Sequence, residues 1–140
     1  MLCVTCDTNI YISGLNLRGN PRRVLDMAEE GLIHLCVSDD ILNEIEEVLR
    51  RPKFGWPEKE IERALKGISR FTQHVKPKYR IDVVKADPDD NRIMECALAG
   101  KSEYLVTGDN HLLDIGQFRG VKIMTPAQFV EMMAQQRRGR

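Results

Sequence analysis

The chain begins with a short apolar run that stops at polar residues: Leu2-Cys3-Val4-Thr5-Cys6-Asp7-Thr8-Asn9. Apolar and β-branched residues favour a strand over residues 2–6, whereas Asp, Thr and Asn are typical of turns and helix caps. A second segment, Tyr104-Leu105-Val106-Thr107-Gly108-Asp109, has the same form. We therefore expect two strands, each followed closely by an aspartate.

Predicted strands and helices alternate along the rest of the chain. Further strands are expected at residues 32–37, 81–84 and 121–124, and a Gly- and Asn-containing loop precedes Asn20. Helices are expected from Asn20-Pro21 to Gly31, from Asp39 to Arg51 after an N-cap at Ser38, from Pro57 onward, from Asp87 to Gly100, and after Thr125-Pro126 with Gln128 as capping-box partner. This alternation predicts an α/β fold, a three-layer α/β/α sandwich whose central sheet has about five mostly parallel strands.

Length and composition set broad limits. The 140 residues suffice for one domain, and 42% hydrophobic with 30% charged residues exclude disordered and fibrous classes. The four cysteines, Cys3, Cys6, Cys36 and Cys96, lie mostly in apolar runs, which predicts reduced, buried thiols. No apolar run approaches the roughly 18 residues of a membrane span and no basic leader is present, so we expect a cytoplasmic protein that does not contact membranes.

Several carboxylates are directed to one edge of the predicted sheet. Ligands of parallel α/β sheets bind beyond the carboxyl ends of the strands, where Asp7 and Asp109 follow strands and Asp90 begins a helix. The helix after Ser38 starts at the same edge, and Glu44 and Glu46 lie on opposite flanks of its apolar stripe. Periodicity does not choose between these two glutamates. Glu44 is about 3 Å nearer the helix start at a rise of 1.5 Å per residue.

Carboxylates gathered without cationic partners repel one another, and a hard divalent cation is the simplest compensation. Oxygen ligands suit Mg²⁺ or Mn²⁺, as one or two ions, and such a site supports hydrolysis of a phosphate ester. Each acid taken singly also has a structural explanation. Asp after a strand is an ordinary turn residue, and Asp87, Asp89 and Asp90 at a helix start favour capping and the helix dipole.

Four segments in order resemble the motifs of PIN-domain nucleases. They are Cys6-Asp7-Thr8-Asn9-Ile10; Leu42-Asn43-Glu44-Ile45 with the following Glu47-Val48-Leu49-Arg50-Arg51-Pro52-Lys53; Asp87-Pro88-Asp89-Asp90-Asn91-Arg92-Ile93; and Leu105-Val106-Thr107-Gly108-Asp109. The chain is most similar to the small prokaryotic members that are toxin components of toxin–antitoxin pairs, relatives of the VapC toxins. The resemblance implies a PIN-like fold in one domain over residues 1–135, followed by a disordered basic tail at residues 136–140.

The resemblance also implies site residues, an activity and partners. Asp7, Glu44, Asp90 and Asp109 would be the catalytic acids that hold Mg²⁺ or Mn²⁺, with Thr8, Asn9, Asn91 and Thr107 supporting them. The implied activity is hydrolysis of RNA phosphodiester bonds by a ribonuclease, and the implied partners are RNA, an antitoxin protein and a second copy of the chain in a homodimer. Asn110 and His111 depart from the family pattern and receive no role.

Other functions remain open. A PIN-like module that binds RNA or protein without cutting is the main alternative, although retaining four acids disfavours a phosphate-binding surface. A zinc or redox site at Cys3-x-x-Cys6 is disfavoured, because residues three apart on a strand face opposite sides and no second cysteine pair follows. A receiver or phosphatase would need a strand-end lysine or a second aspartate two residues after Asp7. Phe54 and Trp56 are expected to anchor an interhelical loop more than to stack on a base.

The net charge first argues against a nucleic-acid partner. The 21 basic residues balance the 21 acidic ones, whereas nucleic-acid binders usually carry a basic excess. Without the four implied site acids, 17 acidic residues remain against 21 basic ones. Bound cations invert the local sign at the acids, so we expect the site to repel RNA without metal and to accept it with metal. We expect segments that flank the cleft to carry the basic residues Arg18, Arg22, Arg23, Arg50, Arg51 and Lys53, although any solvated helix also carries such residues.

Overall fold

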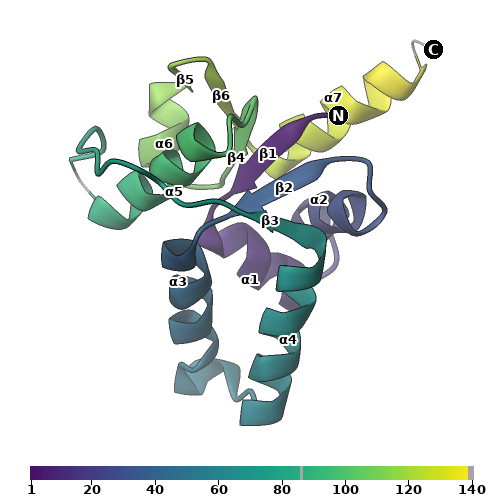
Figure 1. The fold of residues 1–140 in the computed structure, drawn as a ribbon. Helices are drawn as coiled ribbons and strands as arrows, with labels where there is room; N and C mark the ends of the chain where they lie inside the picture. The colour runs from purple at the N-terminus through teal and green to yellow at the C-terminus, as the bar shows by residue number, and fades with distance from the viewer. Residues whose placement is uncertain (86, 139–140) are drawn as a thin grey trace.

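A six-stranded sheet forms the centre of the computed structural model, which describes residues 1–85 and 87–138 (Figure 1). The strands are β1 (Cys3–Cys6), β2 (His34–Val37), β3 (Thr72–His74), β4 (Tyr104–Val106), β5 (Gln117–Phe118) and β6 (Val121–Met124). Their order is β3-β2-β1-β4-β6-β5, and every pair is parallel except the β5–β6 hairpin. The mostly parallel α/β sheet confirms the predicted fold class, with one strand more than expected.

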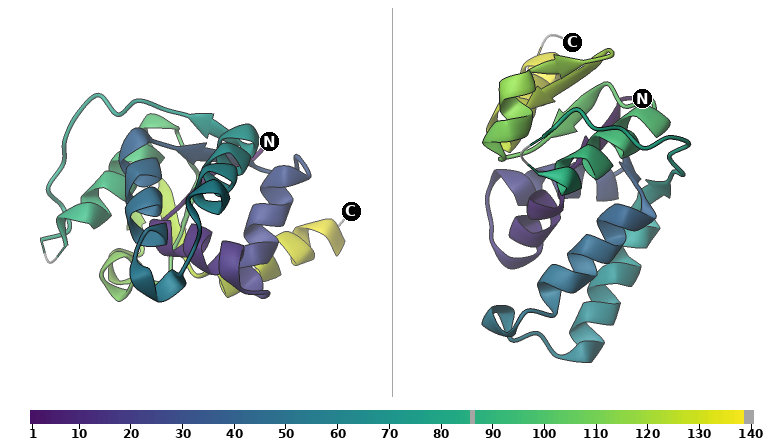
Figure 2. Two further views of the ribbon diagram at one scale, coloured as in Figure 1. Left: turned by 90° about the horizontal axis from the view of Figure 1, so that it is seen from below. Right: turned by 90° about the vertical axis from the view of Figure 1, so that its left-hand side faces the viewer.

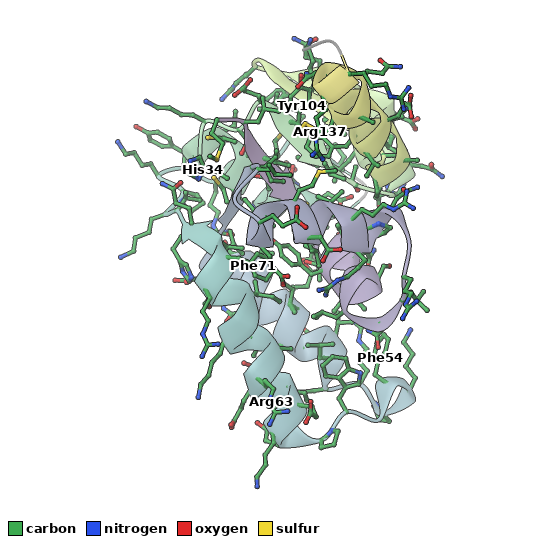
Figure 3. The ribbon with its side chains drawn as sticks, turned by 90° about the vertical axis from the view of Figure 1, so that its right-hand side faces the viewer. His34, Phe54, Arg63, Phe71, Tyr104 and Arg137 are labelled. Carbon is green, nitrogen blue, oxygen red and sulfur yellow. The ribbon has the colours of Figure 1, made fainter. Side chains whose placement is uncertain are left out.

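Helices cover both faces of the sheet. They are α1 (Thr8–Asn16), α2 (Asn20–Glu29), α3 (Asp39–Leu49), α4 (Glu58–Phe71), α5 (Pro88–Ala99), α6 (Asn110–Ile115) and α7 (Pro126–Arg138), with a short 3₁₀ turn at Pro52–Phe54. In Figure 1, α5 lies in front of the sheet and α2 and α7 lie behind it. Tyr104 of β4 meets Phe129 of α7 edge to face, with 5.9 Å between the ring centroids. Figure 3 shows Tyr104 beside α7.

Helices α3 and α4 extend away from the sheet as an arm (Figures 1 and 2). Figure 3 shows Phe71 at the sheet end of α4 and Phe54 toward the far end of the arm. Phe54 and Trp56 are half-buried and pack against the core, and the Trp56 indole N–H donates to Asn16 Oδ1 at 3.3 Å. The two aromatic residues therefore act as the expected loop anchors.

The prediction of a strand at residues 81–84 was wrong. The third strand is Thr72–His74, and residues 81–84 run as an extended segment beside α5 without joining the sheet. Side chains of α5 satisfy the backbone of this segment: Glu95 accepts from the Ile81 N–H at 2.7 Å, and Asn91 accepts from the N–H groups of Val83 and Val84. Part of this apolar run is buried against α5. It therefore has the composition of a strand, although it pairs with no strand of the described sheet.

The loop expected before Asn20 is instead helix α1. Asp7 caps it, because its Oδ1 accepts from the Ile10 N–H at 3.2 Å. Gly14 weakens the helical signal in the sequence, but a Cβ there would lie 2.5 Å from Leu25 Cδ1 of α2. Close packing of α1 on α2 therefore requires Gly14, and a glycine inside a helix makes that helix difficult to predict from the sequence.

Other boundaries agree closely with expectation. Ser38 caps α3, and Thr125 and Gln128 form the capping box of α7. Three details differ from the expected elements. The short helix α6 was not predicted, and α3 ends at Leu49, two residues before the expected Arg51. The N-cap residue of α2 is Gly19. Helix α7 includes residues 136–138 of the expected tail, and residues 139–140 lie outside the described part of the chain.

The four cysteines are free thiols, as expected, and Cys6, Cys36 and Cys96 are buried. Across residues 1–85 and 87–138, no helix combines the length and the apolar character needed to cross a membrane.

The C-terminal end of α5 packs tightly on β2. A Cβ built on Gly100 would lie 2.6 Å from Cys36 Sγ and 2.9 Å from Cys36 Cβ. We predict that Gly100→Ala lowers the free energy of unfolding by about 1–3 kcal/mol, because the added methyl overpacks this contact. Urea denaturation measures the change.

Gly67 in α4 is the matched control, since a Cβ there meets no atom within 4 Å. Gly67→Ala should raise the free energy of unfolding by about 0.5–1 kcal/mol through helix propensity. Equal effects of the two substitutions would contradict the packing argument.

Candidate acidic site

The site lies where the strand order reverses. The chain builds β2 and β3 on one side of β1 and then returns to place β4 on the other side. The carboxyl ends of β1 and β4 therefore flank a switch point, the position at which open α/β sheets bind ligands. Asp7 directly follows β1, and Thr107-Gly108-Asp109 follows β4.

Asp7 is held rigidly from two sides. It is buried, with 4% of its surface exposed. Its Oδ1 accepts from the Ile10 N–H at the start of α1, and its Oδ2 accepts a hydrogen bond from the Thr107 hydroxyl. Thr107 Oγ1 in turn accepts from the Asp109 N–H at 2.9 Å. One threonine thus connects the carboxylate of Asp7 with the backbone of Asp109.

Asp90 is buried without a partner. It lies in the first turn of α5, is 7% exposed, and its Oδ2 has no hydrogen-bond partner among the described residues. Its neighbour Asp87 has an ordinary structural role, because it caps α5 by accepting from the Asp89 N–H at 3.0 Å. A buried carboxylate oxygen with no donor is costly unless a proton or a cation satisfies it.

The structure distinguishes the two glutamates that periodicity left open. Glu44 is half-buried and lines the same cavity as Asp7 and Asp90. Glu46 faces the other way and forms an ion pair with Arg50 at 3.3 Å. Glu44 is therefore the glutamate of the acidic cluster.

These residues enclose a small acidic cavity of about 50 Å³. Its lining consists of Asp7, Thr8, Asn9, Glu44, Asp87, Asp89, Asp90, Ile93 and Asp109. Among the described residues, six carboxyl groups and no lysine or arginine line it. The volume is far below that of pockets for organic ligands, and it suits an ion with a few waters.

Burial and mutual repulsion disturb the titration of the cluster. Burial raises the pKa of Asp7 to about 6, against the opposing hydrogen bond from Thr107. Burial, followed by the negative charges of Asp109 and Asp87, raises the pKa of Asp90 to about 7. Burial and the charges of Asp89 and Asp7 also raise the pKa of Glu44. Titratable groups shifted in this way are typical of functional sites.

The family resemblance implies no role for His111, but the structure places this residue beside the cluster. His111 Nδ1 lies 3.4 Å from Asp109 Oδ1, and Asp109 also accepts from the His111 N–H at 2.7 Å. One potential ligand atom each from Asp90, Asp109 and His111 lies within 4.8 Å of the other two. The signal in the sequence is the Asp109-x-His111 spacing at the N-terminus of α6. Its meaning could not be recognised, because α6 was not predicted.

The remaining supporting residues differ in placement. Thr8 and Asn9 line the cavity, and the Thr8 hydroxyl is buried without a partner in the described structure. Asn91 is directed away from the acids: its side chain bonds the backbone of Val83 and Val84. Its contribution is to fix the segment that leads into α5, which is structural.

A parallel α/β sheet with carboxylates at its switch point is the arrangement of a PIN domain. The chain belongs to the PIN domain family, whose model matches residues 4–111. This match spans β1 to the start of α6 and includes all four acids.

Two solved structures share the fold. One is VapBC2 from Rickettsia felis bound to a DNA fragment from their promoter, with 12% identity, a TM-score of 0.62, and coverage of 89% of this chain and 98% of that chain. The other is DNA-bound VapBC from Salmonella typhimurium, with 16% identity, a TM-score of 0.59, and coverage of 90% and 99%. Comparison with curated protein sequences finds no match.

The raised pKa values predict how stability depends on pH. In the unfolded chain both aspartates titrate near 4, so between about pH 4 and the folded pKa values the folded state binds more protons. The cluster's destabilising contribution therefore grows as pH rises from about 4, and it is complete above about pH 6 for Asp7 and above about pH 7 for Asp90. In EDTA, the melting temperature should be higher at about pH 5.5 than at about pH 8.

Asp90→Asn tests the origin of this dependence, because it removes one buried charge without changing the shape of the side chain. The variant should melt at a higher temperature than the wild type at about pH 8 and show a weaker pH dependence in differential scanning calorimetry. Glu46→Gln is the control and should leave the pH dependence unchanged. A wild type that becomes more stable across this range as pH rises would contradict the assignment.

Proposed function

We propose that the chain is a divalent-metal-dependent endoribonuclease and the toxin component of a toxin–antitoxin pair in the cytoplasm. The observation that carries this proposal is the enclosed cluster of Asp7, Glu44, Asp90 and Asp109, which contains a buried carboxylate oxygen without a partner. Within the part of the chain that the structure describes, no lysine or arginine in the cavity lining offsets these charges. Family membership supports a nuclease, and the four acids lie in the segments that resemble its motifs.

The residues fit a hard divalent cation. The donor set consists of carboxylate oxygens, as Mg²⁺ and Mn²⁺ prefer, and Asp90 Oδ2 is the atom that most needs such a partner. Asp7, Asp90 and Asp109 would hold the ion or ions, with Glu44 as a further ligand or as the base. When bound, the cation supplies charge neutralisation at the phosphate and activation of the attacking water.

The protein's own groups supply orientation and proton transfer. Thr107 fixes the carboxylate of Asp7, and the α1 N-terminus fixes its other oxygen, so the ligand geometry is set before substrate arrives. Glu44 lies across the cavity with a raised pKa, which makes it a stronger base toward the attacking water.

The structural neighbours support the partner part of the proposal. They are VapBC complexes, which suggests that a second protein associates with this chain as well. We also propose a homodimer, because the chain resembles the VapC toxins. A PIN-like module that only binds RNA is less well supported, because six carboxyl groups around the cavity repel phosphate when no cation is present.

We predict Mn²⁺- or Mg²⁺-dependent cleavage of a quenched fluorescent single-stranded RNA, abolished by EDTA. Glu44→Gln should lower the rate at least about a hundredfold, on the order expected for loss of a general base. Glu46→Gln, one helical turn or less away, is the matched control and should keep the wild-type rate. Cleavage that persists in EDTA, or equal loss in the two variants, would refute the catalytic assignment.

Metal binding has a readout independent of catalysis. Because a cation relieves the repulsion only in the folded state, millimolar Mn²⁺ should raise the melting temperature, and the shift should disappear in Asp90→Asn. Identical melting curves with Mn²⁺ and with EDTA would count against a metal site.

A further inference from the structure

A second, positively charged pocket lies along the outer side of α5. It has a volume of about 320 Å³ and is formed by the segment after β3, the end of α5 and the β5–β6 turn. Lys76, Lys78, Lys101 and Arg119 line it, and none of the four has an ion-pair partner within 4.0 Å in the described part of the chain. We name these four residues together with Tyr79 the basic pocket.

The single carboxylate in the lining does not offset this charge. Glu95 is buried and already paired with Arg80 at 3.2 Å and with Arg92 at 2.8 Å. Its other contact is the Ile81 N–H at 2.7 Å. The four exposed cations therefore retain their full attraction for an anion.

Two of these cations occupy backbone positions that favour other residues. Among the described non-glycine residues, only Lys101 (φ 54°) and Arg119 (φ 47°) have positive φ. Lys101 follows the last turn of α5, where its N–H bonds Leu98 O and the Ser102 N–H bonds Ala97 O, a Schellman arrangement that favours glycine. Arg119 precedes Gly120 (φ 86°) in the two-residue turn between β5 and β6, which favours Asn-Gly.

Both cations therefore occupy positions where glycine or asparagine would be less strained, and both line the same pocket. The Arg119 guanidinium lies 4.9 Å from the centre of the Phe118 ring, a cation–π contact that restrains the side chain. Tyr79 is 79% exposed, an unusual position for a large aromatic ring with no core contact. Cations combined with an exposed aromatic ring are what single-stranded nucleic acids bind, through phosphates and base stacking.

We propose that the basic pocket binds a stretch of single-stranded RNA outside the acidic site. Helix α5 connects the two sites: Asp90 lies in its first turn and Leu98, in the pocket, lies about 12 Å further along at 1.5 Å per residue. This proposal rests on the proposed function for the identity of the RNA as substrate, but the binding itself requires neither metal nor cleavage.

The test uses the full chain in EDTA, with binding of a fluorescently labelled single-stranded RNA followed by anisotropy across a salt series. Lys101→Asn/Arg119→Asn removes two cations and places Asn at two positions where positive φ favours it, so the melting temperature should stay the same or rise. The Kd should rise about tenfold, and the slope of log K against log salt should become shallower by about 1.4. Tyr79→Ser should weaken binding about fivefold or more.

The matched control is Lys59→Gln/Lys66→Gln, which removes two exposed charges from α4. Equal loss in this control would overturn the proposal, because the attraction would then be non-specific. Competition by an acidic peptide as effective as RNA of equal charge would overturn it in favour of a protein partner.

Cleavage assays separate this inference from the proposed function. A protein that binds RNA through the basic pocket but does not cleave it with Mn²⁺ would keep the inference and refute the nuclease. A protein that cleaves with Mn²⁺ but whose RNA affinity is unchanged in Lys101→Asn/Arg119→Asn would keep the nuclease and refute the inference.

Discussion

The hydrogen bond from Thr107 to Asp7 joins the carboxyl ends of β1 and β4, and the acidic site depends on it. Parallel pairing of these two strands puts both aspartate-bearing segments at the switch point of the sheet. Without a fixed donor, Asp7 would be a buried carboxylate beside two others, an arrangement that repulsion and desolvation oppose. Thr107 offsets part of this cost and also holds the Asp109 backbone. The same contact therefore makes the cluster tolerable and sets its geometry.

The elements whose signals are local could be predicted from the sequence. Strands β1, β2, β4 and β6 follow from apolar runs, and the caps at Ser38 and Thr125 follow from side-chain chemistry. The elements whose residue types are determined by a tertiary contact could not. Gly14 in α1 is required by the approach of Leu25, so the helix resembles a loop in sequence. The run at residues 81–84 is partly buried, and its backbone N–H groups donate to Asn91 and Glu95 of α5, so a segment bound to a helix resembles a strand in sequence.

The part of the site that follows from sheet topology alone, namely which aspartates meet at one edge, could be predicted from the sequence. Chain direction places Asp7, Asp90 and Asp109 at one edge, and the structure brings all three to one cavity. The choice of Glu44 over Glu46 needed the family resemblance, since helical periodicity puts both on the flanks of one stripe; the Arg50 ion pair of Glu46 shows the difference in space. His111 could not be found, because its place depends on the unanticipated helix α6.

Helix α5 separates two opposite charges, with acids at its first turn and cations beyond its last. The helix dipole favours this polarity at both ends, at roughly 0.3–1 kcal/mol each. The dipole alone does not account for Arg119, which belongs to another element, or for a positive φ at both Lys101 and Arg119 in place of glycine or asparagine. Such positions cost on the order of 1 kcal/mol or more apiece. Under the proposed function, the separation of acids and cations along α5 sets the order in which RNA is bound and then enters the acidic site. RNA is held at the basic pocket irrespective of metal, and its scissile part is admitted to the acidic site only when a cation has reversed the charge there.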